Sequence, residues 1–405
     1  MKIAIVGAGP AGLCAGRHCL KENFSVDTFE QTGLIGGTWN YVACTGYDED
    51  GIPVHSSMYK DLKANLPKQL MSYEDLPYKV YQESYISQEQ VLDYIKTYSK
   101  KFRLEDHVKF FKRVVNVEPQ GNTWLIEFED VRNNRREVQF YDAVMICNGH
   151  YKDAIIPEIS GICSFQGDIS HSCHYRTHEI YKGKRVLIIG AGTSGCDISG
   201  KISSVADKVY VSCKSKPFFP LPDSACEKPL VKEIDGNTAV FTDGTSAKID
   251  AILYCTGYRY SFPFLSKKCG VNVTDKNVHP LYKQIISIEH PTLAFIGVPL
   301  LTCYFPLFDI QVRFFLSTLN GHYKLPSKEE MLQRLNHPVA SKPSRPLTKY
   351  HVLGEATADY FEKLATEANI KRIPPVISKL FIYVMMRRCV NERFRIIDDE
   401  RWEKL

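Results

Sequence analysis

Two glycine-rich segments with the same pattern are the residues in this chain best suited to bind a reactive cofactor. Residues 7–12 read Gly-Ala-Gly-Pro-Ala-Gly after the apolar run 3–6, and residues 190–195 read Gly-Ala-Gly-Thr-Ser-Gly after the apolar run 186–189. The first glycine of this pattern permits a tight turn, the second lets the backbone approach a pyrophosphate, and the third packs a helix against a strand. The N-terminus of that helix faces the negative charge. One such segment is weak support, but two predict two dinucleotides held at once, as in an enzyme that passes electrons from a nicotinamide to a flavin.

The residues that end the strand after each glycine segment predict which dinucleotide each site takes. The first unit is predicted as a strand over 2–6, a helix over 10–20 and a strand over 25–29. Glu30 follows about 20 residues after the glycines, where a carboxylate accepts hydrogen bonds from ribose hydroxyls. The second unit ends in Ser212 and Lys214, and donors of this kind suit a 2′-phosphate that a carboxylate would repel. We therefore expect FAD at the first site and NADPH rather than NADH at the second, unless Lys214 is an ordinary surface lysine.

A second pair of similar segments indicates that the chain has two related halves. Residues 142–151 and 250–258 are both apolar strands that end in a small polar residue and a glycine, where the chain can cross close to a cofactor or between domains. In the second half, residues 239–246 predict a β-hairpin with its turn at Asp243-Gly244. The C-terminal region is predicted to contain a Pro-rich linker at 342–346 and helices over 355–368 and 376–386, the last of them in the core.

Composition narrows the class of protein. The chain has 405 residues, enough for two domains, and a net charge of +5 that is too small to argue for nucleic acid. The thirteen cysteines are scattered without a C-x-x-C pair, which favours reduced thiols and argues against a disulfide reductase. The first strand begins at once after Met1, and the apolar stretch 376–386 is too short to span a bilayer. We expect a soluble, cytoplasmic protein without a membrane anchor, and a secreted protein whose leader was removed stays open.

Residues 165–175 carry a family resemblance. They read Phe-Gln-Gly-Asp-Ile-Ser-His-Ser-Cys-His-Tyr and fit the pattern F-x-G-x-x-x-H-x-x-x-aromatic ahead of the second glycine segment. Further segments of this likeness are 36–39, 62–68, 255–258 and 290–297. The chain resembles the flavin-containing monooxygenases from residue 1 to about residue 370, most of all the soluble insect members, which include pyrrolizidine-alkaloid N-oxygenases. It departs from the family in having Tyr175 where Phe or Trp is usual. We expect no membrane-anchoring tail of the kind that vertebrate members have.

The resemblance implies an α/β fold with two Rossmann-like dinucleotide-binding domains. A discontinuous FAD domain, over 1–154 and 270–405, would contain a smaller inserted NADPH domain over 155–269. It also implies the reaction. NADPH reduces FAD, O2 adds to form a C4a-hydroperoxyflavin, and a soft nucleophile takes one oxygen atom, most often the nitrogen of a tertiary amine such as a pyrrolizidine alkaloid.

The same resemblance suggests individual site residues. Asn65 would lie at the reactive edge of the flavin, unless it only caps the turn before Pro67. Gln311 would lie where a helix N-terminus approaches the flavin. Tyr304 and Phe308 would line an apolar substrate entrance, although aromatic clusters are also ordinary core. The other residues expected at the cofactors are Gly7, Gly9, Pro10, Ala11, Gly12, Glu30, Gln31, Gly37, Thr38 and Trp39 for FAD, and Gly190, Gly192, Thr193, Ser194, Gly195, Ser212 and Lys214 for NADPH.

Several alternatives stay open from the sequence. The chain could be a general xenobiotic N- or S-oxygenase, a Baeyer–Villiger or N-hydroxylating monooxygenase, an NADPH-dependent flavin reductase, or a non-enzymatic NADPH-binding redox sensor. A metal site would need His171, Cys173, His174 and His178 to converge, and no carboxylate completes that set, so we expect no metal. The expected partners are a small amine or sulfide and O2, and a homo-oligomer is left open.

Overall fold

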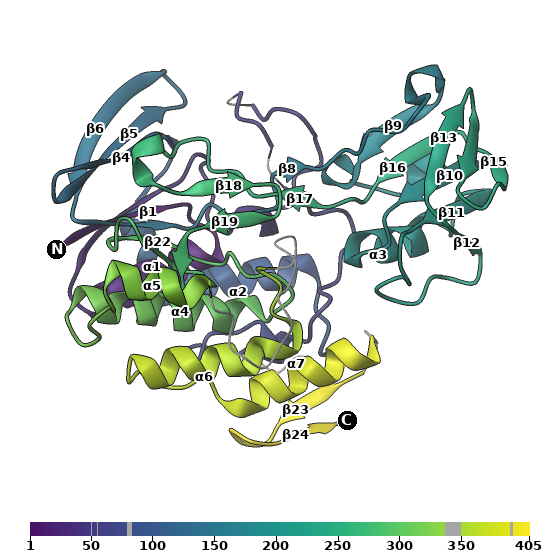
Figure 1. Cartoon of the computed structure of the whole chain (residues 1–405). Helices are drawn as coiled ribbons and strands as arrows, with labels where there is room; N and C mark the ends of the chain where they lie inside the picture. The colour runs from purple at the N-terminus through teal and green to yellow at the C-terminus, as the bar shows by residue number, and fades with distance from the viewer. Residues whose placement is uncertain (50, 55, 79–82, 337–349, 389–391) are drawn as a thin grey trace.

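The apolar runs before the two glycine segments form the central strands of two sheets, one in each lobe of the molecule (Figure 1). The computed structural model describes residues 1–49, 51–54, 56–78, 83–336, 350–388 and 392–405. The Pro-rich stretch 342–346 lies outside these residues, so its assignment as a linker stays a prediction.

In the larger lobe, strand β1 (Lys2–Val6) lies between β2 (Ser25–Phe29) and β7 (Ala143–Ile146) and is parallel to both. Residues 3–6 are buried, as in a parallel strand that is covered on both faces. Helix α1 (Pro10–Lys21) joins β1 to β2 and packs against α4 (Tyr304–Leu319). The sheet runs in the order β20 (Leu281–Tyr282), β21 (Ile286–Ser287), β22 (Leu293–Phe295), β7, β1, β2, β3 (Val108–Lys109).

Helices and smaller sheets cover this sheet. The predicted helix over 355–368 is α6 (Thr357–Glu367), which follows one 3-10 turn, and the predicted helix over 376–386 is α7 (Pro375–Arg387). Val376, Leu380 and Phe381 bury one side of α7, as the sequence predicts. The remaining elements are β4 (Lys112–Gln120), β5 (Thr123–Asp130), β6 (Arg135–Tyr141), α2 (Gln88–Lys101), α5 (Lys328–Asn336), β18 (Asn272–Thr274), β19 (Asn277–His279), β23 (Phe394–Ile396) and β24 (Trp402–Lys404).

The smaller lobe repeats the arrangement around the second glycine segment. Its five-stranded parallel sheet runs β12 (Ala225–Lys228), β11 (Lys208–Ser212), β10 (Arg185–Ile189), β16 (Ala251–Tyr254), β9 (Asp168–His171), and α3 (Thr193–Ile202) follows β10. Strands β13 (Val231–Asp235), β14 (Thr238–Phe241) and β15 (Ser246–Lys248) form an antiparallel sheet. The β14–β15 turn confirms the hairpin predicted at Asp243-Gly244.

Two short strands join the lobes. Strand β8 (Asp153–Ala154) leads into the smaller lobe, β17 (Tyr258–Arg259) leads out of it, and the two pair in antiparallel fashion between the lobes (Figure 1). Strand β8 comes just after the first of the two similar segments, 142–151, and β17 begins at the last residue of the second, 250–258. The strands of these segments, β7 and β16, are parallel neighbours of β1 and β10 respectively. The α/β fold of two Rossmann-like units is thus confirmed, while the domain boundaries stay a prediction. No helix in the described part of the chain is both long and apolar enough to cross a bilayer.

Candidate functional site

The first glycine loop has the geometry that its pattern predicts. Gly7 adopts a φ of +105°, which L side chains rarely adopt, and this makes the tight turn after β1. A Cβ at Gly12 would lie 1.8 Å from the carbonyl oxygen of Gly7, so only glycine lets α1 approach the strand so closely. A Cβ at Gly9 would meet nothing nearer than Gly37 Cα at 3.6 Å. The backbone at Gly9 is therefore open to a ligand.

Helix α1 presents an uncapped N-terminus at this opening. No side chain caps Gly9, and Pro10 occupies the first helical turn, which has no acidic residue. The free N–H groups and the helix dipole favour an anion there. A pyrophosphate fits this cradle.

Glu30 lies beside the loop, at the end of β2. One of its carboxylate oxygens accepts a hydrogen bond from Ala8 N at 3.0 Å, and the other accepts bonds from Thr32 N and Oγ1, each at 3.0 Å. Burial raises the Glu30 pKa against the lowering effect of these bonds. A carboxylate has about four acceptor positions, so the bonds leave capacity for a ribose hydroxyl. Gln31 follows it in the chain, and the roles of both residues stay a prediction.

The segment 36–39 closes the other side of the opening. Gly36 N donates to Ala8 O at 2.9 Å, and Gly37 Cα lies against Gly9. Thr38 Oγ1 and Ser57 Oγ are 3.1 Å apart, and Gln88 donates to the carbonyl oxygen of Trp39. Three segments that are distant in sequence, 7–12, 30–31 and 36–39, are thus brought together around one cradle.

The second glycine loop repeats the first. Gly190 has a φ of +104°, and a Cβ at Gly195 would lie 2.0 Å from Gly190 O. A Cβ at Gly192 would meet nothing within 4 Å, and no side chain caps α3 at this residue. Thr193 and Ser194 form the first turn of the helix. This cradle also fits a pyrophosphate.

The end of β11 differs in part from the prediction. The Ser212 hydroxyl is buried, donates to Pro229 O at 2.9 Å and accepts from Val231 N at 3.2 Å, so it is not presented at the strand end. Ser212 instead ties β11 to the following segment, a contact that its place in the sequence does not reveal. Lys214 is exposed and makes no ion pair within the described residues. The Glu227 carboxylate, which accepts from Cys213 Sγ at 3.8 Å, lies at the same strand end.

Asn65 and Gln311 have contrasting environments. Asn65 is exposed, and its amide makes no hydrogen bond within the part of the chain that the structure describes, so it is not the turn cap considered as an alternative. Gln311 is buried in the middle of α4, whose N-terminus lies at Tyr304. Its side chain accepts from Gly297 N at 2.8 Å and donates to Tyr360 Oη at 2.8 Å. The expectation that Gln311 lies at a helix N-terminus is therefore wrong. Each of its two amide atoms already has one partner, and its contact with the flavin stays a prediction.

Tyr304 and Phe308 share one face of α4, with ring centroids 5.9 Å apart, and both are half-buried. The Tyr304 hydroxyl is 3.0 Å from that of Tyr151, and the His150 ring lies 6.0 Å from the Tyr304 ring. Among the described residues, no hydrogen-bond partner is found for the buried Nε2 atom of His150. Burial lowers the His150 pKa to about 4 and outweighs the opposing effect of the Gly297 backbone. His150 and Tyr151 are not among the residues predicted for this site from the sequence. Their place directly after a buried strand and Asn148-Gly149 is the signal that could have found them.

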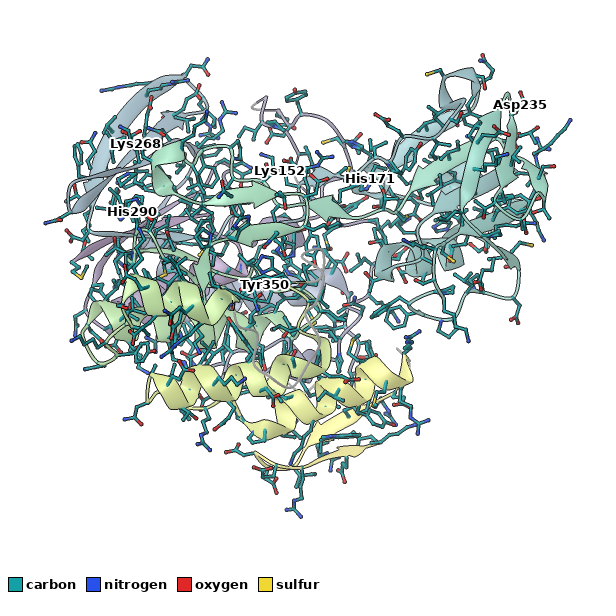
Figure 2. The ribbon with its side chains drawn as sticks, in the orientation of Figure 1. Lys152, His171, Asp235, Lys268, His290 and Tyr350 are labelled. Carbon is teal, nitrogen blue, oxygen red and sulfur yellow. The ribbon has the colours of Figure 1, made fainter. Side chains whose placement is uncertain are left out.

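The residues of the alternative metal site, His171, Cys173, His174 and His178, do not bring three ligand atoms together within the described part of the chain. His171 Nδ1 accepts a hydrogen bond from Cys173 N at 3.1 Å, and Figure 2 shows His171 on the side of the smaller lobe nearest the crossing strands. Within the described ranges, the one group of three potential ligands is Cys14, His18 and Asp309. Asp309 there already accepts from His18 at 2.7 Å and from Arg313 at 2.5 and 2.8 Å, so this is a buried ion-pair network.

Comparison with known proteins agrees with this geometry. A family model described as flavin-binding monooxygenase-like matches residues 1–219 and 223–404. The chain is 33% identical to senecionine N-oxygenase of Tyria jacobaeae over 100% of its own length and 91% of the relative. Among solved structures it is similar to S-allyl-L-cysteine S-oxygenase from Allium sativum, with a TM-score of 0.86, 31% identity and coverage of 96% and 92%.

A second solved structure extends the likeness. The structure of Tmm from Pelagibacter sp. strain HTCC7211 matches with a TM-score of 0.85 and 29% identity, over 94% of this chain and 89% of that one. The two glycine cradles, the shared fold and the match along nearly the whole chain all agree. The chain belongs to the flavin-binding monooxygenase-like family, and it is a flavin-dependent monooxygenase.

Proposed function

We propose that the protein oxygenates the nitrogen of a tertiary amine and that a pyrrolizidine alkaloid is its favoured substrate. The observation that carries the reaction is the pair of glycine cradles, each open at an uncapped helix N-terminus. Oxygenation with NADPH needs a nicotinamide and a flavin together, and this chain has one cradle for each. The likeness to senecionine N-oxygenase along the full chain supports the amine.

The proposed reaction consumes one amine, one O2, one NADPH and one proton. One oxygen atom forms a bond with the lone pair of the amine nitrogen, and the other leaves as water with the two electrons of NADPH. Bound FAD supplies the chemistry that activates O2. The amine must be unprotonated, because its lone pair makes the new bond.

The residues of the chain would bind and orient the participants. FAD would be held by Gly7, Gly9, Pro10, Ala11, Gly12, Glu30, Gln31, Gly37, Thr38 and Trp39, and NADPH by Gly190, Gly192, Thr193, Ser194, Gly195 and Lys214. Asn65 offers a free, uncharged amide, which can donate a hydrogen bond at the reacting atoms without adding charge.

The aromatic cluster at the start of α4 is the proposed substrate contact. Tyr304, Phe308 and Tyr151 give an apolar surface, and His150 beside them is neutral because burial lowers its pKa to about 4. A neutral, aromatic surface favours the unprotonated amine over its ammonium form.

Oxygenation of a sulfur atom is the second candidate. The similarity to S-allyl-L-cysteine S-oxygenase supports it, and a thioether presents the same kind of lone pair as an amine. The cradles do not distinguish the two, because the choice of nucleophile is made at the substrate contact.

The organisation of the chain supports two further proposals. The strands of the smaller sheet all lie within residues 155–269, in agreement with an inserted NADPH domain between FAD segments 1–154 and 270–405. Every cysteine in the described part of the chain is a free thiol, which supports a reducing compartment such as the cytoplasm.

In the test, the purified protein is supplied with NADPH, air and equal amounts of a pyrrolizidine alkaloid and a thioether. Mass spectrometry then measures both products. We expect the N-oxide in clear excess. An excess of sulfoxide would favour the second candidate, sulfur oxygenation, over amine oxygenation. Formation of hydrogen peroxide without either product would contradict oxygenation of both amines and thioethers.

A further inference from the structure

Residues 56–62 belong to the first chain segment of the larger lobe but pack into the core of the smaller lobe. Tyr59 is 7% exposed, and its ring contacts the Tyr175 ring edge to face at 5.1 Å. Tyr59 and Leu62 pack with Val186 and Ile198 in the core of the smaller lobe. This short segment therefore spans the contact between the two lobes.

Helix α3 holds the segment from the NADPH side. The Tyr59 hydroxyl donates to an Asp197 carboxylate oxygen, and Lys201 Nζ donates to Asp61 O at 2.9 Å. Asp197 lies one turn after Thr193, where α3 begins at the second glycine cradle. Any ligand that shifts this helix N-terminus acts on the helix that anchors Tyr59.

Arg176 adds a second attachment from the smaller lobe. Its guanidinium is buried and donates to Val42 O at 2.7 Å and Ser56 O at 3.1 Å, and it also bonds two carbonyl oxygens of its own segment. The Arg176 carbonyl oxygen accepts from Lys60 N at 2.9 Å. The side chain and the backbone of this one residue therefore both hold the 56–62 segment.

The larger lobe holds the same segment from the other side. Ser56 Oγ donates to Thr38 O at 3.2 Å, Gln88 N donates to Leu62 O at 3.0 Å, and Ala64 N donates to Ile86 O at 2.8 Å. Asn65 comes directly after Ala64, and its side chain makes no hydrogen bond to any described residue. Its position is therefore set by the backbone on both sides of it, by the 56–64 segment before it and by Lys68 after it, whose N donates to Ser84 O at 2.7 Å.

We propose that Tyr59, through its hydrogen bond to Asp197, is a positioning residue that ties residues 56–64 to α3 and thereby fixes Asn65. The inference rests on the proposed role of Asn65 in oxygenation. Occupation of the NADPH cradle would thus be transmitted through α3, Asp197 and Tyr59 to the residue at the reacting atoms.

The test compares Tyr59→Phe with Tyr141→Phe. Tyr141 is a matched control, because it is also buried and donates to an aspartate, Asp27 Oδ2 at 2.7 Å, but it lies on β6 of the larger lobe. Each variant loses one hydroxyl bonded to a carboxylate and keeps its ring. Asp197→Asn keeps an acceptor for Tyr59 and should behave like the unaltered protein, whereas Asp197→Ala loses the acceptor and should behave like Tyr59→Phe.

Two readouts follow, both on the FAD-loaded protein. The first readout is hydrogen exchange measured by mass spectrometry. The amides of residues 60–66 should exchange about tenfold faster in Tyr59→Phe and Asp197→Ala than in the unaltered protein, whereas their exchange rate should not change in Tyr141→Phe. The yield of N-oxide per NADPH should fall about fivefold in the same two variants, because a misplaced group loses its effect on the reacting atoms.

The outcomes separate the inference from the proposed function. Unchanged exchange of residues 60–66 in both variants would overturn the tie to α3. Faster exchange with an unchanged product yield would overturn the positioning of Asn65. If the unaltered protein formed no N-oxide, the proposed function would fail, and hydrogen exchange would still decide the tie. Asp197 is exposed, so Asp197→Ala keeps the test valid if Tyr59→Phe does not fold.

Discussion

The two glycine loops share one backbone geometry but lead to strands with opposite chemistry. Their first glycines have φ values of +105° and +104°, and in each the third glycine packs against the carbonyl oxygen of the first. Strand β2 leads to the buried carboxylate of Glu30, whereas β11 leads to the exposed ammonium of Lys214. The common geometry accounts for binding of a pyrophosphate. We propose that the side chain at the strand end distinguishes one dinucleotide from the other.

The helices that follow the loops are also fixed differently. Helix α1 is held inside its own lobe by His18, which bonds Asp309 on α4 at 2.7 Å. Helix α3 is held by Tyr59, which comes from the other lobe. The helix of the first glycine cradle is therefore bonded within the larger lobe, whereas the helix of the second is bonded to a segment at the contact between the lobes.

The largest expected effects come from the third glycines. In Gly12→Ala or Gly195→Ala the new Cβ would lie 1.8 or 2.0 Å from a carbonyl oxygen, so the helix must shift away from its cradle. We expect more than about 100-fold weaker FAD binding in Gly12→Ala. Gly195→Ala should keep its flavin and lose NADPH binding to a similar extent. The flavin absorbance retained by the purified protein measures FAD binding, and titration calorimetry measures NADPH binding.

Gly200→Ala on α3 is the control, because a Cβ there would meet nothing within 4 Å. It should bind both dinucleotides normally. If Gly195→Ala lost FAD as readily as NADPH, the assignment of one dinucleotide to each cradle would be wrong.

Asn65→Asp should uncouple NADPH oxidation from product formation while FAD stays bound. The change replaces a donor by a negative charge, and loss of one donor at the reacting atoms costs about 100-fold. The N-oxide formed per NADPH consumed is the measurement. Asn272→Asp, at an exposed position on β18, is the matched control. Equal product yields in the two variants would remove Asn65 from the mechanism.

Lys214→Ala tests the difference between the strand ends. Loss of one charge-assisted bond to the 2′-phosphate should raise the KM for NADPH about tenfold and leave the KM for NADH nearly unchanged. Lys208→Ala, at the opposite end of β11, should change neither value. If Lys214→Ala raised both KM values equally, another group must recognise the 2′-phosphate.

The smallest expected effect concerns the hydrogen bond between His18 on α1 and Asp309 on α4 at low pH. Burial alone would raise the Asp309 pKa, but the His18 hydrogen bond and the Arg313 charge outweigh it and lower the pKa to about 2. An aspartate in an unfolded chain has a pKa of about 4, so this stabilisation is present above that pH and is lost as the pH falls toward the folded-state pKa. Between pH 6 and pH 3 this group should lower the free energy of unfolding by about 1 kcal/mol.

Urea unfolding at pH 6 and pH 3 checks this in the unaltered protein and in Asp309→Asn. The variant lacks the ionisable group, so it should lose less stability over that interval. An equal loss in both proteins would contradict the role of Asp309 charge in bracing α1.

Local patterns made much of this molecule predictable from its sequence. The two glycine loops, the strand and helix order around them and the hairpin at Asp243-Gly244 depend on residues close together in the chain. Those predictions match the structure in element type and place. Glu30 was predictable because its distance from the glycines is fixed by one helix and one strand.

The rest depends on contacts between residues that are distant in sequence. Ser212 looked like a phosphate ligand, but Pro229 and Val231 use its hydroxyl. Gln311 looked available to the flavin, but Gly297 and Tyr360 engage its amide. The Tyr59–Asp197 bond joins two lobes, and no local pattern marks it.

The most direct test of the central claim supplies ¹⁸O2 and NADPH to the FAD-loaded protein with a pyrrolizidine alkaloid. Mass spectrometry then measures the label in the product, and absorbance measures the NADPH consumed. We predict an N-oxide with one ¹⁸O atom and close to one NADPH used per product. NADPH consumption that yields only hydrogen peroxide, with no labelled N-oxide, would contradict the account.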